Sequence, residues 1–364
     1  MTFKTAIRDA LALTRSQRLI EATEKIQSAL SGREQPAREI PNQSIPSKYL
    51  GKAVRPLAQV VQTLQKLKQS QFALGKTTRW PGHAEPELID GARFFTRSFS
   101  CKAGSRSYRL YVPNHKPANQ RPLLVMLHGC KQNPSDFAVG TRMNALAEEH
   151  GMLVAYPAQA QSSNPSSCWN WFNPGHQQQG IGEPSIIAGI TAEIIRTYDI
   201  DARRVFVAGL SAGGAMAVVM GVTYPQMYSA VGVHSGLPYR SATDVVSAFA
   251  AMRGETPHQT ISASTKIRTI VFHGDADETV SHSNAMRIIG DIQCSTNFKE
   301  HGTSKGGRKY TRHVLKDQMG VSVVENWVIH GAGHAWSGGS PQGSYTDNKG
   351  PDASTEMARF FLNP

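Results

Sequence analysis

Residues 205–221 read VFVAGLSAGGAMAVVMG, and this stretch decides the fold. Its first four residues are an apolar run typical of a buried strand, residues 209–213 form a turn of small residues, and the rest continues as a helix. Glycines at 209 and 213 leave room where strand and helix approach closely, and Ser211 must take a strained backbone conformation. Such a turn lifts the serine hydroxyl clear of a sheet, to a helix N-terminus that favours developing negative charge. Ser211 is therefore the candidate nucleophile.

The strand–turn–helix unit lies within a longer alternation of strands and helices that begins near residue 93. This alternation predicts an α/β fold, with a mostly parallel sheet covered by helices on both faces. In such sheets ligands bind at the carboxyl ends of the strands. Strands are predicted at 108–112, 123–127, 152–156, 205–208, 230–233, 269–273 and, as a hairpin-like pair, 310–315 and 321–329; helices are predicted at 135–150 (capped by Ser135 or Asp136), 184–198, from the serine turn to 224, 284–292 and 353–362.

A serine hydroxyl needs a neighbouring base to remove its proton. When the nucleophile lies in a Gly-x-Ser-x-Gly turn, the chain order is serine, acid, histidine. Among the histidines far downstream, His334 lies in the sequence GAGHAW at 331–336, a loop between the last strand and the last helix. His330 belongs to the end of the strand and is more typical of a packing or hydrogen-bonding residue. His334 is therefore the predicted base.

The acid is expected after the strand at 269–273, where residues 273–280 read HGDADETV. Asp275 directly follows His-Gly and is explained as a turn former. Asp277 lies further into the loop, where the following residues can hold it, and Glu278 is a weaker third candidate. Asp277 is the predicted partner of the histidine, orienting the imidazole without itself taking the proton.

Ester and amide hydrolysis also requires two backbone N–H groups directed at the tetrahedral oxyanion. One donor is expected from Ala212, which follows the nucleophile. The other is expected from Cys130, in the His-Gly-Cys sequence after the strand at 123–127. Cys130 could be an ordinary buried thiol, but a disulfide that braces the loop is at least as plausible, with Cys168 as its natural partner.

A long loop at about 158–183 contains several aromatic residues. Long loops without secondary structure are usually functional. Its aromatic side chains, with one beside the candidate histidine, predict an apolar wall for an acyl or alkyl chain. The alternative is that the indoles pack down on the sheet. The residues of this predicted pocket are Trp169, Trp171, Phe172 and Trp336.

The chain has 364 residues and a formal charge of +12, of which residues 1–80 carry +9, with fourteen Lys/Arg against five Asp/Glu. This segment is predicted to be helical, with an irregular connector at 31–56. It is interpreted either as a packing extension of a catalytic domain at 93–364 or as a basic element that docks on polymer or an anionic surface. Nucleic acid is not an expected partner, because no binding signature accompanies the charge.

No run of residues is long and apolar enough for a membrane span, and charged residues interrupt any secretory signal. The missing signal favours a protein made in the cytoplasm, whereas the cysteine count leaves the compartment open. The four cysteines are too few for a disulfide scaffold, the histidines lack metal-ligand spacing, and neither a metal nor an organic cofactor is expected.

Six motifs, taken together and in order, resemble the polyhydroxybutyrate depolymerase family of esterases over residues 93–364. They are LHGC at 127–130, CWNWF at 168–172, GLSAG at 209–213, HGDADETV at 273–280, GAGHAWSGG at 331–339 and SYTD at 344–347. The resemblance implies an α/β-hydrolase fold, a Ser211–Asp277–His334 triad and hydrolysis of carboxylic esters, with a polyester or its oligomers as substrate. The family is similar to feruloyl and acetyl xylan esterases, and many relatives are extracellular.

Three other functions remain as alternatives. A feruloyl or acetyl xylan type of carbohydrate esterase would use the same residues. A peptidase of the oligopeptidase type shares the His-Gly-x-x-Asp spacing, but no propeller-like repeat precedes the domain. A non-enzymatic role would be granule or surface docking through residues 1–80.

Overall fold

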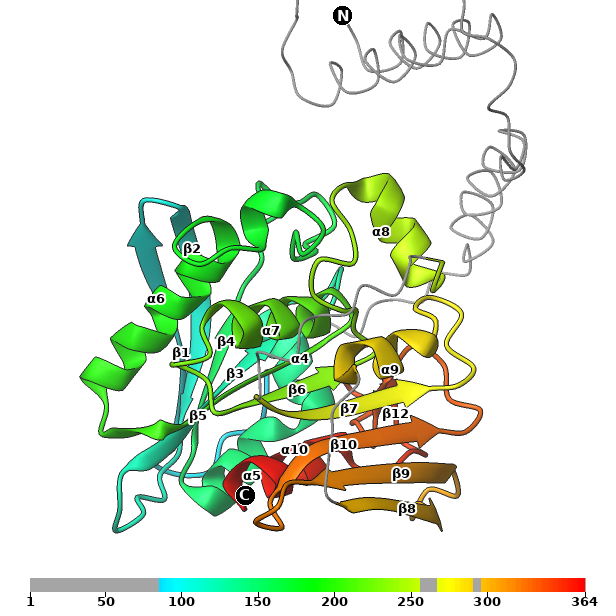
Figure 1. The fold of residues 1–364 in the computed structure, drawn as a ribbon. Helices are drawn as coiled ribbons and strands as arrows, with labels where there is room; N and C mark the ends of the chain where they lie inside the picture. The colour runs from blue at the N-terminus through cyan, green and yellow to red at the C-terminus, as the bar shows by residue number, and fades with distance from the viewer. Residues whose placement is uncertain (1–84, 256–266, 291–295, 364) are drawn as a thin grey trace, which may run out of the picture. The chain divides into compact units, whose positions relative to one another are not determined.

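The computed structural model describes residues 85–255, 267–290 and 296–363, coloured in Figure 1. The predicted helical extension at 1–80 lies outside the described residues. None of the helices in the described ranges combines the length and apolar character needed to cross a membrane.

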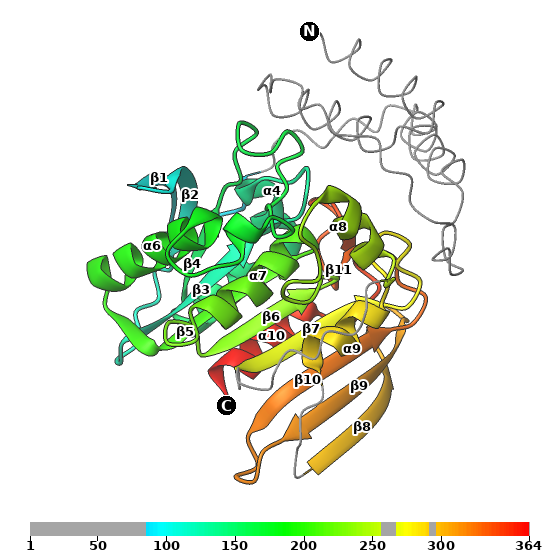
Figure 2. The same cartoon turned by 45° about the horizontal axis from the view of Figure 1, so that its top comes forward.

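The described residues form one ten-stranded sheet with the order β1-β2-β4-β3-β5-β6-β7-β10-β9-β8 (Figures 1 and 2). A separate parallel pair, β11 (Trp336–Ser337) and β12 (Thr346–Asp347), lies near the C-terminus. The strands of the large sheet are β1 (Arg93–Cys101), β2 (Gly104–Val112), β3 (Arg121–Leu127), β4 (Leu153–Pro157), β5 (Ile200–Leu210), β6 (Ala230–His234), β7 (Arg268–Gly274), β8 (Thr296–Thr303), β9 (Lys309–Lys316) and β10 (Ser322–Ile329).

The centre of the sheet is parallel, as predicted. Strands β4, β3, β5, β6, β7 and β10 pair with one another in parallel. Most of their central residues are apolar and buried, because both faces are covered by helices. The two edges are antiparallel, where β1 and β2 form one hairpin and β8, β9 and β10 form a meander. Strands β1 and β8 were not predicted, because their many polar residues and exposed side chains lack the apolar pattern of a buried strand.

Helices cover both faces of the sheet and bury two separate cores. Alternate residues of β3 show the division, since Leu123, Val125 and Leu127 belong to one core whereas Leu124 and Met126 belong to the other. The first core is covered by α6 (Gly182–Thr197), α7 (Ala212–Thr223), α8 (Val245–Met252) and α9 (Ser283–Ile289), and the second by α4 (Pro134–Thr141), α5 (Met143–His150) and α10 (Ala353–Leu362); a short 3-10 helix, η2 (Pro174–His176), precedes α6.

The predicted helix at 135–150 is wrong as a single element. Arg142 takes a left-handed backbone conformation, with φ of 54°, and divides the segment into α4 and α5. The cap also differs from the prediction: the Asn133 side chain accepts a hydrogen bond from the Asp136 N–H, and Pro134 begins the helix. Helix α8 was not predicted.

The ends of three strands carry the predicted catalytic residues. Ser211 follows β5, Asp277 follows β7 and His334 follows β10. Because β5, β6, β7 and β10 are adjacent and parallel, their carboxyl ends lie along one edge of the sheet. The topology therefore gathers segments that are more than 120 residues apart in sequence.

Candidate active site

Ser211 lies at the tip of the turn between β5 and α7, in a conformation that side chains rarely adopt. Its φ is 57° and its ψ is −119°. Non-glycine residues occupy such regions only where the surrounding structure holds them, and such residues cluster at functional sites. Ser211 is only partly exposed, and its N–H donates to the His234 carbonyl at the end of β6, 2.9 Å away.

The glycines on either side of Ser211 are required by close backbone contacts. A Cβ at Gly213 would lie 2.0 Å from the Leu127 carbonyl oxygen, and one at Gly209 would lie 2.4 Å from the Gly213 carbonyl. A Cβ at Gly129 would be 3.6 Å from the Ser211 Cβ, so the loop after β3 passes directly beside the serine. The turn and the predicted oxyanion loop are therefore packed together through backbone.

His334 and Asp277 are joined by a hydrogen bond of 2.7 Å between Nδ1 and Oδ2. The Asp277 side chain is fully buried, whereas that of His334 is 13% exposed. Within the described ranges, neither His334 Nε2 nor Ser211 Oγ makes a hydrogen bond to a protein group, with each other or elsewhere. Hydrogen bonds between a nucleophile and its base often tighten only when substrate binds.

The Asp277 carboxylate is held by four groups. Its Oδ1 accepts the N–H groups of Thr279 and Val280, both at 2.9 Å, and its Oδ2 faces His273 Nε2 at 3.4 Å as well as His334. Burial raises the pKa of this carboxyl, but the hydrogen bonds from His273 and His334 outweigh burial and hold the pKa well below its usual range. Asp277 is therefore ionised and suited to orient an imidazolium.

The other candidate acid and the other candidate base pair with each other. His330 Nδ1 contacts Asp275 Oδ2 at 2.7 Å, and His330 Nε2 contacts Thr311 Oγ1 at 2.8 Å. Both ring nitrogens of His330 are thus engaged, whereas His334 keeps Nε2 open. This difference favours His334 over His330 as the base.

His234 lies between the serine and the histidine loop. Its carbonyl accepts from Ser211, and its Nε2 accepts from the Ser337 N–H at 3.0 Å. Burial, followed by the neighbouring imidazoles of His273 and His334, lowers the pKa of His234 to about 3. His234 is therefore neutral, and it connects the Ser211 turn to the loop that carries His334.

The two predicted oxyanion donors, Ala212 and Cys130, lie in the turn after β5 and in the loop after β3. Among the described residues, neither the Cys130 N–H nor the Ala212 N–H donates to a protein acceptor. The Gly129 carbonyl accepts from His128 Nδ1 at 2.8 Å and from the Gln132 N–H at 3.2 Å. Because the peptide is planar and trans, the Cys130 N–H points away from those two donors.

Buried polar contacts fix the loop around Gly129. The Gly129 N–H donates to Gln132 Oε1 at 3.0 Å, and Gln132 Nε2 donates to the Ser344 carbonyl at 3.1 Å. Burial lowers the pKa of His128 to about 4, so this imidazole is neutral and its Nε2 accepts from the Gln159 N–H at 3.1 Å.

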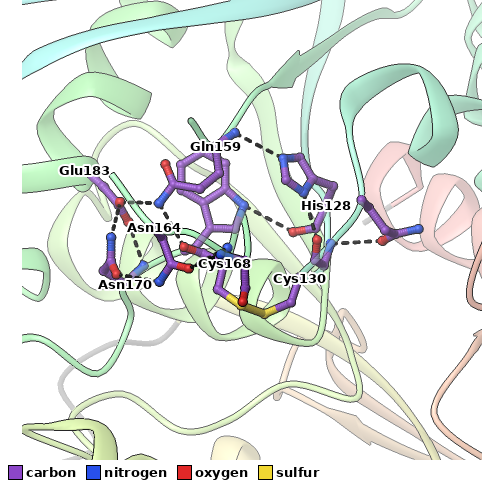
Figure 3. The surroundings of a disulfide bond; sticks show 11 residues. His128, Cys130, Gln159, Asn164, Cys168, Asn170 and Glu183 are labelled. Carbon is purple, nitrogen blue, oxygen red and sulfur yellow. Dashed lines mark hydrogen bonds between the residues drawn. A yellow bond between two sulfur atoms is a disulfide. The ribbon is translucent and has the colours of Figure 1, made fainter. Parts of the chain in front are cut away.

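A disulfide between Cys130 and Cys168 ties this loop to the long loop before α6 (Figure 3). Glu183, almost fully buried at the start of α6, accepts from the N–H and side-chain amide of Asn170 at 2.8 and 2.7 Å and also from Gln159. Gln159 in turn donates to the Cys168 carbonyl at 2.8 Å. The covalent bond and the buried carboxylate hold the long loop against the predicted oxyanion donor.

The prediction that tryptophan side chains line an apolar substrate pocket is wrong. Trp169 is 0% exposed and donates to the His128 carbonyl, and Trp336 is 1% exposed and donates to Ser354 Oγ. Trp171 is also buried, whereas Phe172 is half-buried. The indoles pack into the two cores, because each finds a buried acceptor or apolar neighbours there. The alternative interpretation, that the indoles pack down on the sheet, is therefore the one observed.

Two residues that hold the site were not predicted from the sequence. His273, which contacts Asp277, was signalled by its position at the end of the strand that precedes the acid. Gln132 had no comparable signal, because its bonds reach Gly129 locally and Ser344 far along the chain. Within the described ranges no three His, Cys, Asp or Glu side chains converge in a way that could hold a metal ion.

Known proteins resemble this chain in fold and in sequence. The solved acetyl xylan esterase from Aspergillus awamori superposes with a TM-score of 0.56 at 19% identity, covering 73% of this chain and 98% of the esterase, which shows the same α/β-hydrolase fold. Poly(3-hydroxyalkanoate) depolymerase C of Paucimonas lemoignei is 32% identical over 257 residues, 65% of this chain. The match spans 60% of the depolymerase.

Feruloyl esterase B of Neurospora crassa is 36% identical over 246 residues, 62% of this chain and 81% of that esterase. The family model described as esterase PHB depolymerase matches residues 106–312, more than half of the chain. This match includes the loop after β3, the turn that holds Ser211 and the loop after β7. The chain therefore belongs to the esterase PHB depolymerase family.

Proposed function

We propose that the protein is a serine carboxylic ester hydrolase that works through an acyl-enzyme on Ser211. The observation that carries the proposal is the buried Asp277 carboxylate bound to His334 Nδ1, which leaves Nε2 open at the strand edge where Ser211 lies. Family membership and the strained backbone of Ser211 support the same assignment.

In the proposed reaction, His334 Nε2 takes the proton of Ser211 Oγ as the oxygen attacks the ester carbonyl carbon. The N–H groups of Ala212 and Cys130 stabilise the resulting oxyanion. The imidazolium, stabilised by Asp277, then protonates the departing alcohol. Water, deprotonated by His334, hydrolyses the acyl-enzyme and restores the free serine.

Replacement of the nucleophile tests this mechanism. Ser211→Ala should lower kcat on a p-nitrophenyl ester by about 10⁴-fold or more, since the serine, base and acid act as a unit. Ser281→Ala, which removes another partly buried hydroxyl at the start of α9, should leave turnover unchanged. Retention of wild-type turnover by Ser211→Ala would exclude the mechanism.

For the substrate, we propose a hydroxybutyrate-type polyester or its oligomers, supported by the family and by the similarity to depolymerase C. A feruloyl-type carbohydrate ester is the second candidate, favoured by the greater share of feruloyl esterase B that this chain matches. The discriminating measurement is kcat/KM on hydroxybutyrate trimer, methyl ferulate and acetylated xylan, with product analysis on polymer film.

Residues 1–80 are proposed to dock the catalytic domain on polymer or an anionic surface, on the basis of their charge of +9. Deletion of these residues should abolish co-sedimentation with polymer granules and leave kcat on a soluble ester within about twofold, because surface charges act over roughly 10 Å in salt. Loss of both properties with loss of the folded state would instead favour a packing role.

A further inference from the structure

Two carboxylate–imidazole pairs join the loop after β7 to the loop after β10. The inner pair is Asp277 and His334, and the outer pair is Asp275 and His330, each with a 2.7 Å contact between Nδ1 and Oδ2. The outer pair has no role in the proposed reaction. Its side chains are 33% and 41% exposed, so its effect on stability should be small.

The outer carboxylate also holds the peptide that leads to His334. Asp275 Oδ1 accepts from the Gly331 N–H at 2.6 Å, and Arg308 Nη1 donates to the Gly331 carbonyl at 2.8 Å. Gly331 has a left-handed φ of 70° and lies three residues before His334. Both backbone polar groups of Gly331 are thus held at the point where the chain turns into the loop that carries His334.

Backbone contacts align the two loops beside this clamp. The Asp275 N–H donates to the Ile329 carbonyl and the Ala276 N–H to the Ala332 carbonyl, both at 3.1 Å. A Cβ at Gly274 would lie 2.2 Å from the Ala332 carbonyl oxygen. Beyond Ala332, the side chain of His334 is bound to the loop after β7 by its hydrogen bond to Asp277. The geometry of the inner pair therefore depends on how Gly331 and Ala332 are held.

We propose that Asp275, together with His330, is a positioning residue that holds the Gly331 peptide and so sets the His334 ring against Asp277 and Ser211. The outer pair does not touch the reacting atoms. It acts by fixing the path of the histidine loop, and small displacements of a base are costly because proton transfer requires hydrogen-bond distance. This inference rests on the proposed function.

The first test is Asp275→Ala in the full-length protein, assayed on a p-nitrophenyl ester. We expect kcat to fall about 10-fold with KM within about twofold, since the change affects the proton-transfer step and not substrate binding. The rate at which a fluorophosphonate labels Ser211 should fall to the same extent. His330→Ala, which leaves the Gly331 bond to Asp275 intact, should give a smaller loss and serves as the second variant if the first is unstable.

A matched control exists at the opposite edge of the sheet. Asp201, at the start of β5, also accepts from one backbone N–H and one side chain, both of Arg203, at 2.9 and 3.2 Å. Asp201→Ala removes the same kinds of contact far from the strand ends that carry the site. It should match Asp275→Ala in melting temperature and leave kcat unchanged.

The mechanism of the effect is tested in an Asp277→Ala background. If Asp275 acts through His334, its replacement should cost less than about twofold once the inner pair is already broken. An equal loss in both backgrounds, or a kcat of Asp275→Ala equal to that of Asp201→Ala, would overturn the inference. Those results leave the proposed function standing, which fails only if Ser211→Ala keeps ester turnover or the wild-type protein has none.

Discussion

At the scale of single residues, the candidate site depends on which ring nitrogen of His334 carries its proton. The Asp277 carboxylate accepts from His334 Nδ1, which leaves Nε2 unprotonated and able to receive the serine proton. In the sequence, their positions within the two loops favoured these residues over Asp275, a turn former, and His330, at a strand end. The structure adds a physical reason: Asp275 pairs with His330 and Asp277 with His334, and of these two histidines His334 keeps a ring nitrogen open within the described residues.

Asp277→Asn tests this tautomer directly. An asparagine could still accept from the Thr279 and Val280 N–H groups through Oδ1, but its amide would then face His334 Nδ1. The imidazole would then carry its proton on Nε2, so this nitrogen could no longer accept the serine proton as the base. We expect kcat/KM to fall by about 10⁴-fold.

The measurement is ester turnover together with circular dichroism, which should show an intact fold. Exposed Glu278, the adjacent carboxylate, provides the control, and Glu278→Gln should retain wild-type turnover. Full activity of Asp277→Asn would mean that another group orients the base.

At the scale of elements, the strand–turn–helix around Ser211 is held by backbone contacts to the β3 loop. Gly213→Ala would place a methyl 2.0 Å from the Leu127 carbonyl oxygen and 2.6 Å from that of His128. Since both neighbours are backbone atoms, one at the end of β3 and one directly after it, neither can move without displacing the main chain. We expect a loss of about 3 kcal/mol or more in the free energy of unfolding, with loss of turnover, measured by urea denaturation and ester assay.

Gly333→Ala is the matched control, because a Cβ there meets nothing within 4 Å even though the residue adjoins His334. That variant should fold and turn over ester normally. A stable, active Gly213→Ala protein would contradict the close packing of the turn.

The long loop before α6 depends on the disulfide. In the chain-entropy model, a bridge closing the 38-residue separation of Cys130 and Cys168 stabilises the fold by about 4 kcal/mol. Cys168→Ser should therefore lower the free energy of unfolding by several kcal/mol, and should reduce kcat because the Cys130 N–H loses its brace.

Denaturation and turnover of this variant would be compared with those of Cys101→Ser. Cys101 is a free, exposed cysteine at the end of β1, and its replacement should change neither quantity. Equal kcat values for the two variants would show that the bridge does not support the oxyanion donor.

At the scale of the whole molecule, two buried neutral histidines make stability depend on pH. Burial lowers the pKa of His128 to about 4 and that of His234 to about 3, whereas both titrate near 6.5 when unfolded. Above pH 6.5 both states are neutral and the full stability is present. As the pH falls from 6.5 toward 4, only the unfolded chain gains these protons, so stability is lost by up to about 1.4 kcal/mol per pH unit for each histidine.

Urea denaturation at pH 7.5, 6 and 5 measures this slope. His128→Gln should reduce the slope, and replacement of the exposed His150 by Gln should leave it unchanged. The buried carboxylate of Asp277 acts in the same direction, since its pKa is also held below its usual value, but its stabilisation is lost only at more acidic pH, below the ordinary titration range of a carboxyl group. A free energy of unfolding that is constant from pH 7.5 to 5 would contradict the neutral burial of the histidines.

The parts of the fold that local chemistry encodes were predictable from sequence. The apolar strand, the glycines and the helix around Ser211 follow from periodicity and small-residue requirements over a few residues. Helix α10 was predicted with its observed limits, because its amphipathic pattern and Asp352 cap are local. By contrast, β1 and β8 are polar edge strands, and Arg142 divides a helix through a backbone conformation that no residue pattern signals.

The Ser211 turn was determined by the sequence alone, because a sharp strand-to-helix turn needs its glycines wherever it occurs. Only the tertiary structure decided what surrounds that turn. The pairing of Asp277 with His334, the separate pairing of Asp275 with His330, and the burial of Trp169 and Trp336 all join segments distant in sequence. Such contacts depend on strand order and core packing, which arise from the whole chain and leave no mark on any one stretch of it.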